Sequence, residues 1–163
     1  MRFRGTMLLY STVVLAGCGS QEQYAATLDS SAAVETVSDS VAPAGPVAYA
    51  PITGRVREVK MMGDGIGYRF EPAVIRAKPG DGVRFIIHSF GPHNVVFDST
   101  AIPAGQRAQL HANMRVAEDL GSPMLFDEAE AWELSLGRLK PGRYRFICSP
   151  HLGANMTGEI IIE

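Results

Sequence analysis

Residues 142–163, GRYRFICSPHLGANMTGEIIIE, contain two strand patterns with a short loop between them. Before the loop, Tyr144, Phe146 and Cys148 occupy every second position. Successive side chains of a β-strand point to opposite faces, so we expect these three to share one buried face. After the loop, Ile160 and Ile162 repeat the pattern. The stretch therefore predicts two β-strands around a short connecting loop.

The residues upstream show further short apolar runs separated by turns. Lys-Pro-Gly occurs at 78–80 and again at 140–142, and both tripeptides predict turns. Helical periodicity is weak, and only 113–120 is expected to form a turn or two, with Asn113 as its N-cap. Several short strands at this spacing predict an all-β sandwich. The predicted strands are 74–77, 83–88, 94–97, 132–136, 143–148 and 158–163.

The loop holds three side chains that bind metals. Cys148, His151 and Met156 offer a thiolate, an imidazole nitrogen and a thioether. Such soft and borderline donors select copper over calcium or magnesium, and a His₂Cys set with a distant axial Met is the blue-copper arrangement. A second histidine is therefore required. The candidates are His88, His93 and His111.

Of these histidines, His93 is favoured. It follows a Gly-Pro corner at the start of a predicted strand, so its side chain can reach the end of the sandwich that carries the Cys148 loop. A ligand from a separate strand also ties the loop to a rigid scaffold. His88 is out of phase with Phe85 and Ile87 and should face outward. Each donor alone could be an ordinary structural residue, but the joint pattern favours a metal site.

Several motifs resemble those of plastocyanin-type cupredoxins. They are GPHNVVFD (91–98), YRFICSPH (144–151) and MTGEIIIE (156–163), and the resemblance covers residues 52–163. It implies a cupredoxin-like Greek-key β-sandwich and one type 1 copper ion. It also implies that the backbone N–H of Asn94 donates to the Cys148 sulfur and so tunes the metal. The copper ligands that it implies are His93, Cys148, His151 and Met156.

The sequence departs from the plastocyanin pattern at three places. The span between His93 and Cys148 is longer than usual, and we expect the extra residues within 106–127. Asn155 replaces a glycine, which Asn's tolerance of positive φ should allow. Ile147 stands where plant plastocyanins carry an exposed Tyr. The last change places the photosynthetic partner in question and leaves the copper chemistry unaffected.

The resemblance implies one-electron transfer, with copper cycling between Cu(II) and Cu(I) and with partners such as cytochromes or membrane complexes. We expect His151 to be the electron port within a small apolar docking face, as transient redox encounters use small interfaces. The alternative is a copper carrier or buffer that releases its metal readily. An enzyme is not expected, because the chain has no His-x-His cluster. The predicted docking face is Phe90, Pro92, Pro150 and Leu152.

The N-terminal residues predict export. Basic residues at positions 2 and 4 precede a short apolar run at 7–14, as in a secretory signal peptide. Leu-Ala-Gly-Cys at 15–18 resembles the lipobox of bacterial lipoproteins, in which the cysteine is acylated. We therefore predict a signal peptide at 1–17 and a lipid anchor on Cys18, facing the periplasm or cell exterior. A plain signal peptide with an incidental cysteine is the alternative, and Gly19 favours the outer membrane.

Composition separates a linker from a folded domain. Residues 18–50 are rich in Ser, Ala and Pro and bury too little apolar surface to repay the entropy of ordering, which predicts a disordered linker. The domain at 51–163 holds 13 of the 15 basic and 13 of the 17 acidic residues, so its charges balance. It has no basic surface that suggests nucleic acid, and we expect a monomer.

Overall fold

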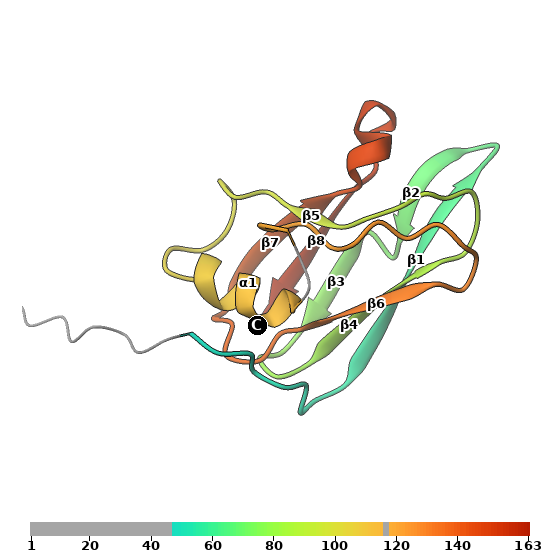
Figure 1. Ribbon diagram of the computed structural model, residues 1–163. Coiled ribbons are helices and arrows are strands. Elements are labelled where there is room, and N and C mark those ends of the chain that lie inside the picture. The colour runs from blue at the N-terminus through green and yellow to red at the C-terminus, as the bar shows by residue number, and fades with distance from the viewer. Residues whose placement is uncertain (1–46, 116–117) are drawn as a thin grey trace, which may run out of the picture. The chain divides into compact units, whose positions relative to one another are not determined.

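The computed structural model describes residues 47–115 and 118–163, which form two facing β-sheets and one α-helix (Figure 1). One sheet has the strand order β2-β1-β4-β6 and the other β3-β8-β7-β5. This architecture confirms the predicted all-β sandwich. The strands are β1 (Val56–Asp64), β2 (Gly67–Glu71), β3 (Val74–Ala77), β4 (Gly82–Ile87), β5 (Val96–Phe97), β6 (Ala131–Ser135), β7 (Gly142–Ile147) and β8 (Thr157–Ile162).

Parallel and antiparallel pairs are mixed in both sheets. Strand β1 pairs in parallel with β4, and β3 pairs in parallel with β8. The remaining neighbours are antiparallel, including β7 and β8, which flank the Cys148 loop. The loop therefore leaves and re-enters the same sheet on adjacent strands, which fixes both of its ends.

Aromatic side chains join the two sheets. The ring of Phe146 on β7 meets those of Phe70 on β2 and Phe85 on β4 edge-on, at centroid distances of 4.8 and 5.3 Å. Such T-shaped pairs are favoured by the ring quadrupole. Phe146 lies fully buried between Tyr144 and Cys148, so the predicted inward alternation of β7 is confirmed.

The strands β1 and β2 were not predicted. In β1 the inward residues are Val59, Met61 and Gly63, with the exposed Lys60 and the partly buried Met62 between them. Gly and Met are not typical strand residues, so the local pattern was weak. Strand β5 is also shorter than the predicted 94–97, because the chain around His93 pairs with Leu125 only as an isolated bridge.

The helix lies earlier than expected. Helix α1 spans Arg107–Met114, so the predicted helical range 113–120 was wrong. Asn113 lies in the last turn of the helix and not at its N-cap. The side chain of Asn113 is buried, and its amide donates to the carbonyl groups of Ser135 and Gly137 at 3.0 and 2.7 Å. The helix is held by these tertiary contacts, while few apolar residues mark it in the sequence.

Residues just before position 51 contact helix α1. The buried backbone N–H of Ala50 donates to Asn113 Oδ1 at 3.1 Å, and Gln109 donates to the carbonyl of Ala48 at 3.0 Å. The last residues of the predicted linker 18–50 therefore contact the domain. The predicted signal peptide, Cys18 and the linker up to residue 46 lie outside the described residues. Within the described ranges, no helix is both long and apolar enough to span a membrane.

Candidate metal centre

The Cys148 loop is closed by its own backbone. Cys148 follows β7 in an extended conformation, and the short 3₁₀ turn η1 (Ser149–Ala154) comes next. The N–H of Cys148 donates to the carbonyl of Met156 at 3.0 Å, and the N–H of Met156 donates to that of His151 at 3.3 Å. These bonds hold Cys148, His151 and Met156 in one compact turn at an end of the sandwich (Figure 1).

A left-handed residue completes the turn. Asn155 has φ 57° and ψ 36°, and its N–H donates to the carbonyl of Leu152 at 2.9 Å. The left-handed region is strained for most residues with a Cβ atom, and Asn is among those that enter it. The expectation that Asn155 can stand in the glycine position is confirmed.

His93 comes from the opposite side of the loop. Its backbone exchanges two hydrogen bonds of 2.9 Å with Leu125, in the antiparallel bridge between their segments. Its ring Nε2 lies 3.1 Å from the carbonyl oxygen of Ser89, an acceptor that requires the proton on Nε2. The other nitrogen, Nδ1, is thereby left as a lone-pair donor, as metal-binding histidines require.

Three donor atoms converge in the interior. Nδ1 of His93 and Nδ1 of His151 lie 3.6 and 3.5 Å from Sγ of Cys148. All three atoms lie within 4.8 Å of one another. Metal–nitrogen bonds of about 2.0 Å and metal–sulfur bonds of about 2.3 Å, known from zinc sites, would separate N from S by roughly 3.5–3.8 Å. The observed spacing fits one metal ion between the three atoms.

Met156 completes the donor set by position and chemistry. It is fully buried and directly precedes β8, and its backbone is paired with Cys148. A thioether is a weak ligand that favours copper, and a nitrogen–nitrogen–thiolate set with Met is the blue-copper combination. The residues present therefore fit a type 1 copper ion.

The surroundings adjust the proton affinities of the donors. Burial raises the pKa of the Cys148 thiol, and hydrogen bonds from the backbone N–H groups of Asn94 and His151 oppose that rise. Burial lowers the pKa of both His93 and His151, and for His151 the charge of His93 lowers it further. Neutral imidazoles bind metals, so burial favours the metal-binding form of both histidines. The Asn94 contact is the one that the resemblance implied.

The other histidines lie apart from this cluster. His88 is exposed directly after β4, as its phase predicted, and His111 is exposed on α1. Neither belongs to the cluster of donor atoms found among the described residues. The choice of His93 from the three candidates therefore agrees with the geometry.

Three of the four residues of the predicted docking face are exposed. Phe90 is 70% exposed and Leu152 is 56% exposed, Pro150 is exposed and Pro92 is half-buried. Phe126 is also exposed, at 65%, and its backbone carbonyl lies close to Gly91.

Tyr68 was missed. Its ring stacks on the imidazole of His151, with centroids 3.6 Å apart and an interplanar angle of 11°. The same ring meets His93 edge-on at 6.1 Å. Recognition of β2 would have placed Tyr68 and Phe70 on one face, but not beside a loop so distant in sequence.

Comparison with known families agrees with this centre. A family described as copper binding proteins, plastocyanin/azurin family, matches residues 57–163. The chain belongs to this family. The match confirms the predicted plastocyanin-like blue copper protein with one type 1 copper ion.

Individual relatives support the same assignment. The chain is 36% identical over 114 residues to plastocyanin of Prochlorothrix hollandica, which covers 70% of this chain and 78% of that protein. It is 30% identical over 139 residues to the chloroplastic plastocyanin of Tetradesmus obliquus, and the match covers 84% of this chain and 88% of that protein. The oxidized plastocyanin structure from Dryopteris crassirhizoma matches with a TM-score of 0.50 and 29% identity, over 66% of this chain and 100% of that one.

Proposed function

We propose that this protein is an exported one-electron carrier whose single type 1 copper is held by His93, Cys148, His151 and Met156. The observation that carries the proposal is the unequal exposure of the donors: His93, Cys148 and Met156 are fully buried, while His151 is partly exposed. When bound there, copper supplies a Cu(II)/Cu(I) couple. The chain's own part is to keep the same donors in place in both oxidation states.

His151 connects the interior to the docking face. Its Nδ1 lies 3.5 Å from Cys148 Sγ, and Leu152, the next residue of the loop, is exposed, as is Phe90. An apolar rim lets a partner approach closely and dissociate quickly, as small transient interfaces do. The proposed partners at this face are redox proteins such as cytochromes or membrane complexes. The domain acts as a monomer in this proposal.

The protein is not assigned an enzymatic activity. Catalytic metal sites keep an open coordination position, whereas here the chain offers four protein donors for one metal. A copper carrier is the alternative, and it should release copper to a chelator within the time of a partner encounter. Burial of Cys148 and His93 supports slow release instead.

The chain enters the domain at the end away from the metal centre. Ser135 Oγ donates to the carbonyl of Ala50, and Ser135 pairs with Gly82 at the start of β4. The metal centre lies beyond the other ends of these strands (Figure 1). An anchor on Cys18 and the predicted linker at 18–50 would leave the docking face free. In this proposal the lipid holds the protein on a membrane facing the periplasm or cell exterior, with the outer membrane favoured by Gly19.

A docking variant tests the electron-carrier proposal. Leu152→Lys should slow reduction by a cytochrome or a small metal-complex reductant in stopped-flow absorbance, because it places a desolvated charge in the apolar face. Val56→Lys is the matched control, since Val56 is also exposed but starts β1 at the far end. Equal rates for both variants, or rapid copper transfer from wild type to a chelator, would favour the carrier alternative. Mass spectrometry of the membrane-extracted protein tests the acylation of Cys18.

A further inference from the structure

The stacked ring of Tyr68 covers the one ligand that the loop leaves partly exposed. His151 sits in the short turn η1 with non-helical dihedral angles of −114° and 25°. The hydrogen bonds of the described residues include a carbonyl acceptor for the outer nitrogen of His93 but none for that of His151. A stack at 3.6 Å and 11° is therefore the contact that fixes the plane of the His151 ring.

Gly63 makes room for the Tyr68 ring. A Cβ atom built on Gly63 would lie 2.7 and 2.9 Å from the ring carbons Cε1 and Cδ1 of Tyr68, and 2.8 Å from Cβ of Phe90. Real side chains do not approach so closely, so a residue larger than glycine would displace the ring. The glycine is required here by space, because its φ is not in the left-handed region.

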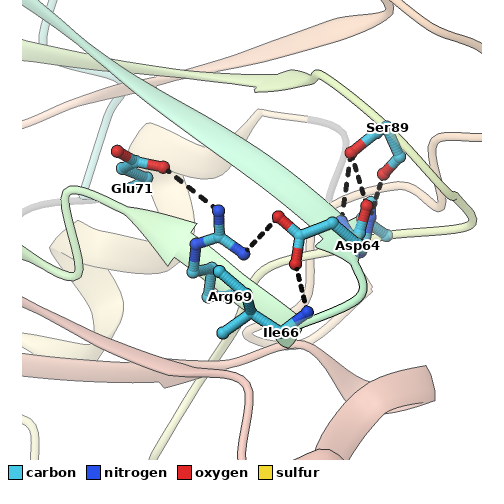
Figure 2. Close-up of polar contacts among 7 residues, drawn as sticks. Asp64, Ile66, Arg69, Glu71 and Ser89 are labelled. Atoms are coloured by element: carbon cyan, nitrogen blue, oxygen red, sulfur yellow. Dashed lines mark hydrogen bonds and ion pairs between the residues drawn. The ribbon is translucent and has the colours of Figure 1, made fainter.

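The hairpin that carries Tyr68 is fixed by polar contacts. Asp64 accepts hydrogen bonds of 2.8 Å from the backbone of Ile66 and from the guanidinium of Arg69, as Figure 2 shows. Ser89 Oγ donates to the carbonyl of Gly63 at 2.7 Å, and the N–H of Gly63 donates back to it at 3.2 Å. The turn between β1 and β2 therefore has little freedom.

The same contacts tie the hairpin to the other histidine. Ser89, which bonds to Gly63, also presents its carbonyl oxygen to Nε2 of His93 at 3.1 Å. The β1–β2 hairpin thus touches one histidine through Ser89 and the other through Tyr68. It sets the two imidazoles relative to each other independently of the Cys148 loop.

We propose that Tyr68 is a positioning residue that holds the His151 imidazole in its metal-binding orientation before metal arrives, with Gly63 and Ser89 holding Tyr68 itself. The copper-related consequence rests on the proposed function: a ring held in place needs little rearrangement when the oxidation state changes. The orientation itself is a property of the protein without metal, and can be tested there.

The test is NMR spectroscopy of the metal-free protein with labelled histidine. Protons of an imidazole that lies flat against an aromatic ring are shifted upfield by its ring current. We expect this shift for His151 in wild type and in Tyr68→Phe, and its loss in Tyr68→Leu and Gly63→Ala. Ile66→Ala is the matched control, because Ile66 is an exposed neighbour on the same hairpin. His93 signals report whether the rest of the site is intact.

The copper-loaded variants complete the test. We expect Tyr68→Leu to change the reduction potential and to slow electron self-exchange, with Tyr68→Phe close to wild type. An unshifted His151 in the metal-free wild type, or a shift retained in Tyr68→Leu, would overturn the positioning role whatever the copper protein does. If the NMR shift is lost but the reduction potential and the self-exchange rate are unchanged, the positioning of His151 by Tyr68 does not affect electron transfer, and that part of the proposal is overturned. If Tyr68→Leu does not fold, Gly63→Ala, which keeps the tyrosine, decides the question.

Discussion

Oδ1 of Asn94 accepts hydrogen bonds from both the backbone N–H and the hydroxyl group of Ser149, at 2.8 and 3.1 Å. Asn94 follows the first histidine ligand and Ser149 follows the cysteine, so the two bonds join the two halves of the metal centre. The backbone N–H of Asn94 also bonds to the Cys148 sulfur. One residue therefore fixes both the position and the electrostatics of the thiolate.

Asn94→Ala should remove the two hydrogen bonds that join the His93 segment to the Cys148 loop. The N–H of Ser149 loses its partner, and we expect the free energy of unfolding of the metal-free protein to fall by about 1–2 kcal/mol. Ser149→Ala is the control, because it removes only the hydroxyl bond and should cost less. Urea unfolding followed by fluorescence measures both. An Asn94→Ala protein as stable as Ser149→Ala would show that the backbone bond does not hold the loop.

Asn155 provides a test of the loop conformation. With φ at 57°, Asn155→Ala should destabilise the metal-free protein by about 1 kcal/mol, because the Cβ atom of an ordinary residue is strained in this region. Asn155→Gly should be as stable as wild type or nearly so. Equal losses in the two variants would mean that the Asn side chain, rather than its backbone conformation, matters here.

The metal donors could be predicted because their signals are local. Cys148, His151 and Met156 lie in one loop, and the alternation of Tyr144 and Phe146 gives the orientation of Cys148 directly. The Gly-Pro corner before His93 gave the fourth ligand. The fold class followed from short apolar runs and turns, which depend only on the two-residue period of strands.

The missed features depend on contacts between distant segments. Tyr68 stacks on His151 because β2 passes beside η1, and no local pattern in either segment indicates that contact. Helix α1 was placed too late because its apolar signal is short, with Leu110 and Met114 in the core, and the buried hydrogen bonds of Asn113 complete its attachment to the domain. Sequence periodicity reports burial of apolar side chains and is silent about such polar anchors.

The Asn113 anchor leads to a stability prediction. Its Oδ1 accepts from Ala50 and Gln109 at 3.1 and 2.8 Å, and its Nδ2 donates to two carbonyl groups. Asn113→Ala leaves several of these buried groups unpaired, and we expect a loss on the order of 3 kcal/mol. His111→Ala, on the exposed side of the same helix, should stay within about 0.5 kcal/mol of wild type. Denaturant unfolding measures the free energy of unfolding of both variants. Similar losses in the two would contradict the role of Asn113 as a buried polar anchor.

Asp81 should make stability depend on pH. Hydrogen bonds from the backbone N–H groups of Lys78 and Arg55, with the charge of Arg57, hold the pKa of Asp81 below its usual value despite burial. A carboxyl group with a lowered pKa in the folded state stabilises it fully above the unfolded-state value of about 3.9. That contribution disappears as the pH falls through the lower folded-state pKa.

Asp81→Asn removes this titration. Wild type should exceed Asp81→Asn by about 1.5–3 kcal/mol in unfolding free energy near pH 7, and the difference should shrink as the pH drops below 4. Urea unfolding curves across this range measure it. A difference that is constant with pH would assign the effect to side-chain shape instead of charge.

The visible absorption and electron paramagnetic resonance spectra of the Cu(II)-loaded domain test the central claim most directly. A buried thiolate from Cys148 with two imidazole nitrogens should give one bound copper, an intense blue band and a type 1 resonance signal. Both features should vanish in Cys148→Ser and persist in His88→Ala, whose histidine is exposed and outside the cluster. A wild-type protein that binds copper but remains colourless when oxidised would contradict the type 1 assignment.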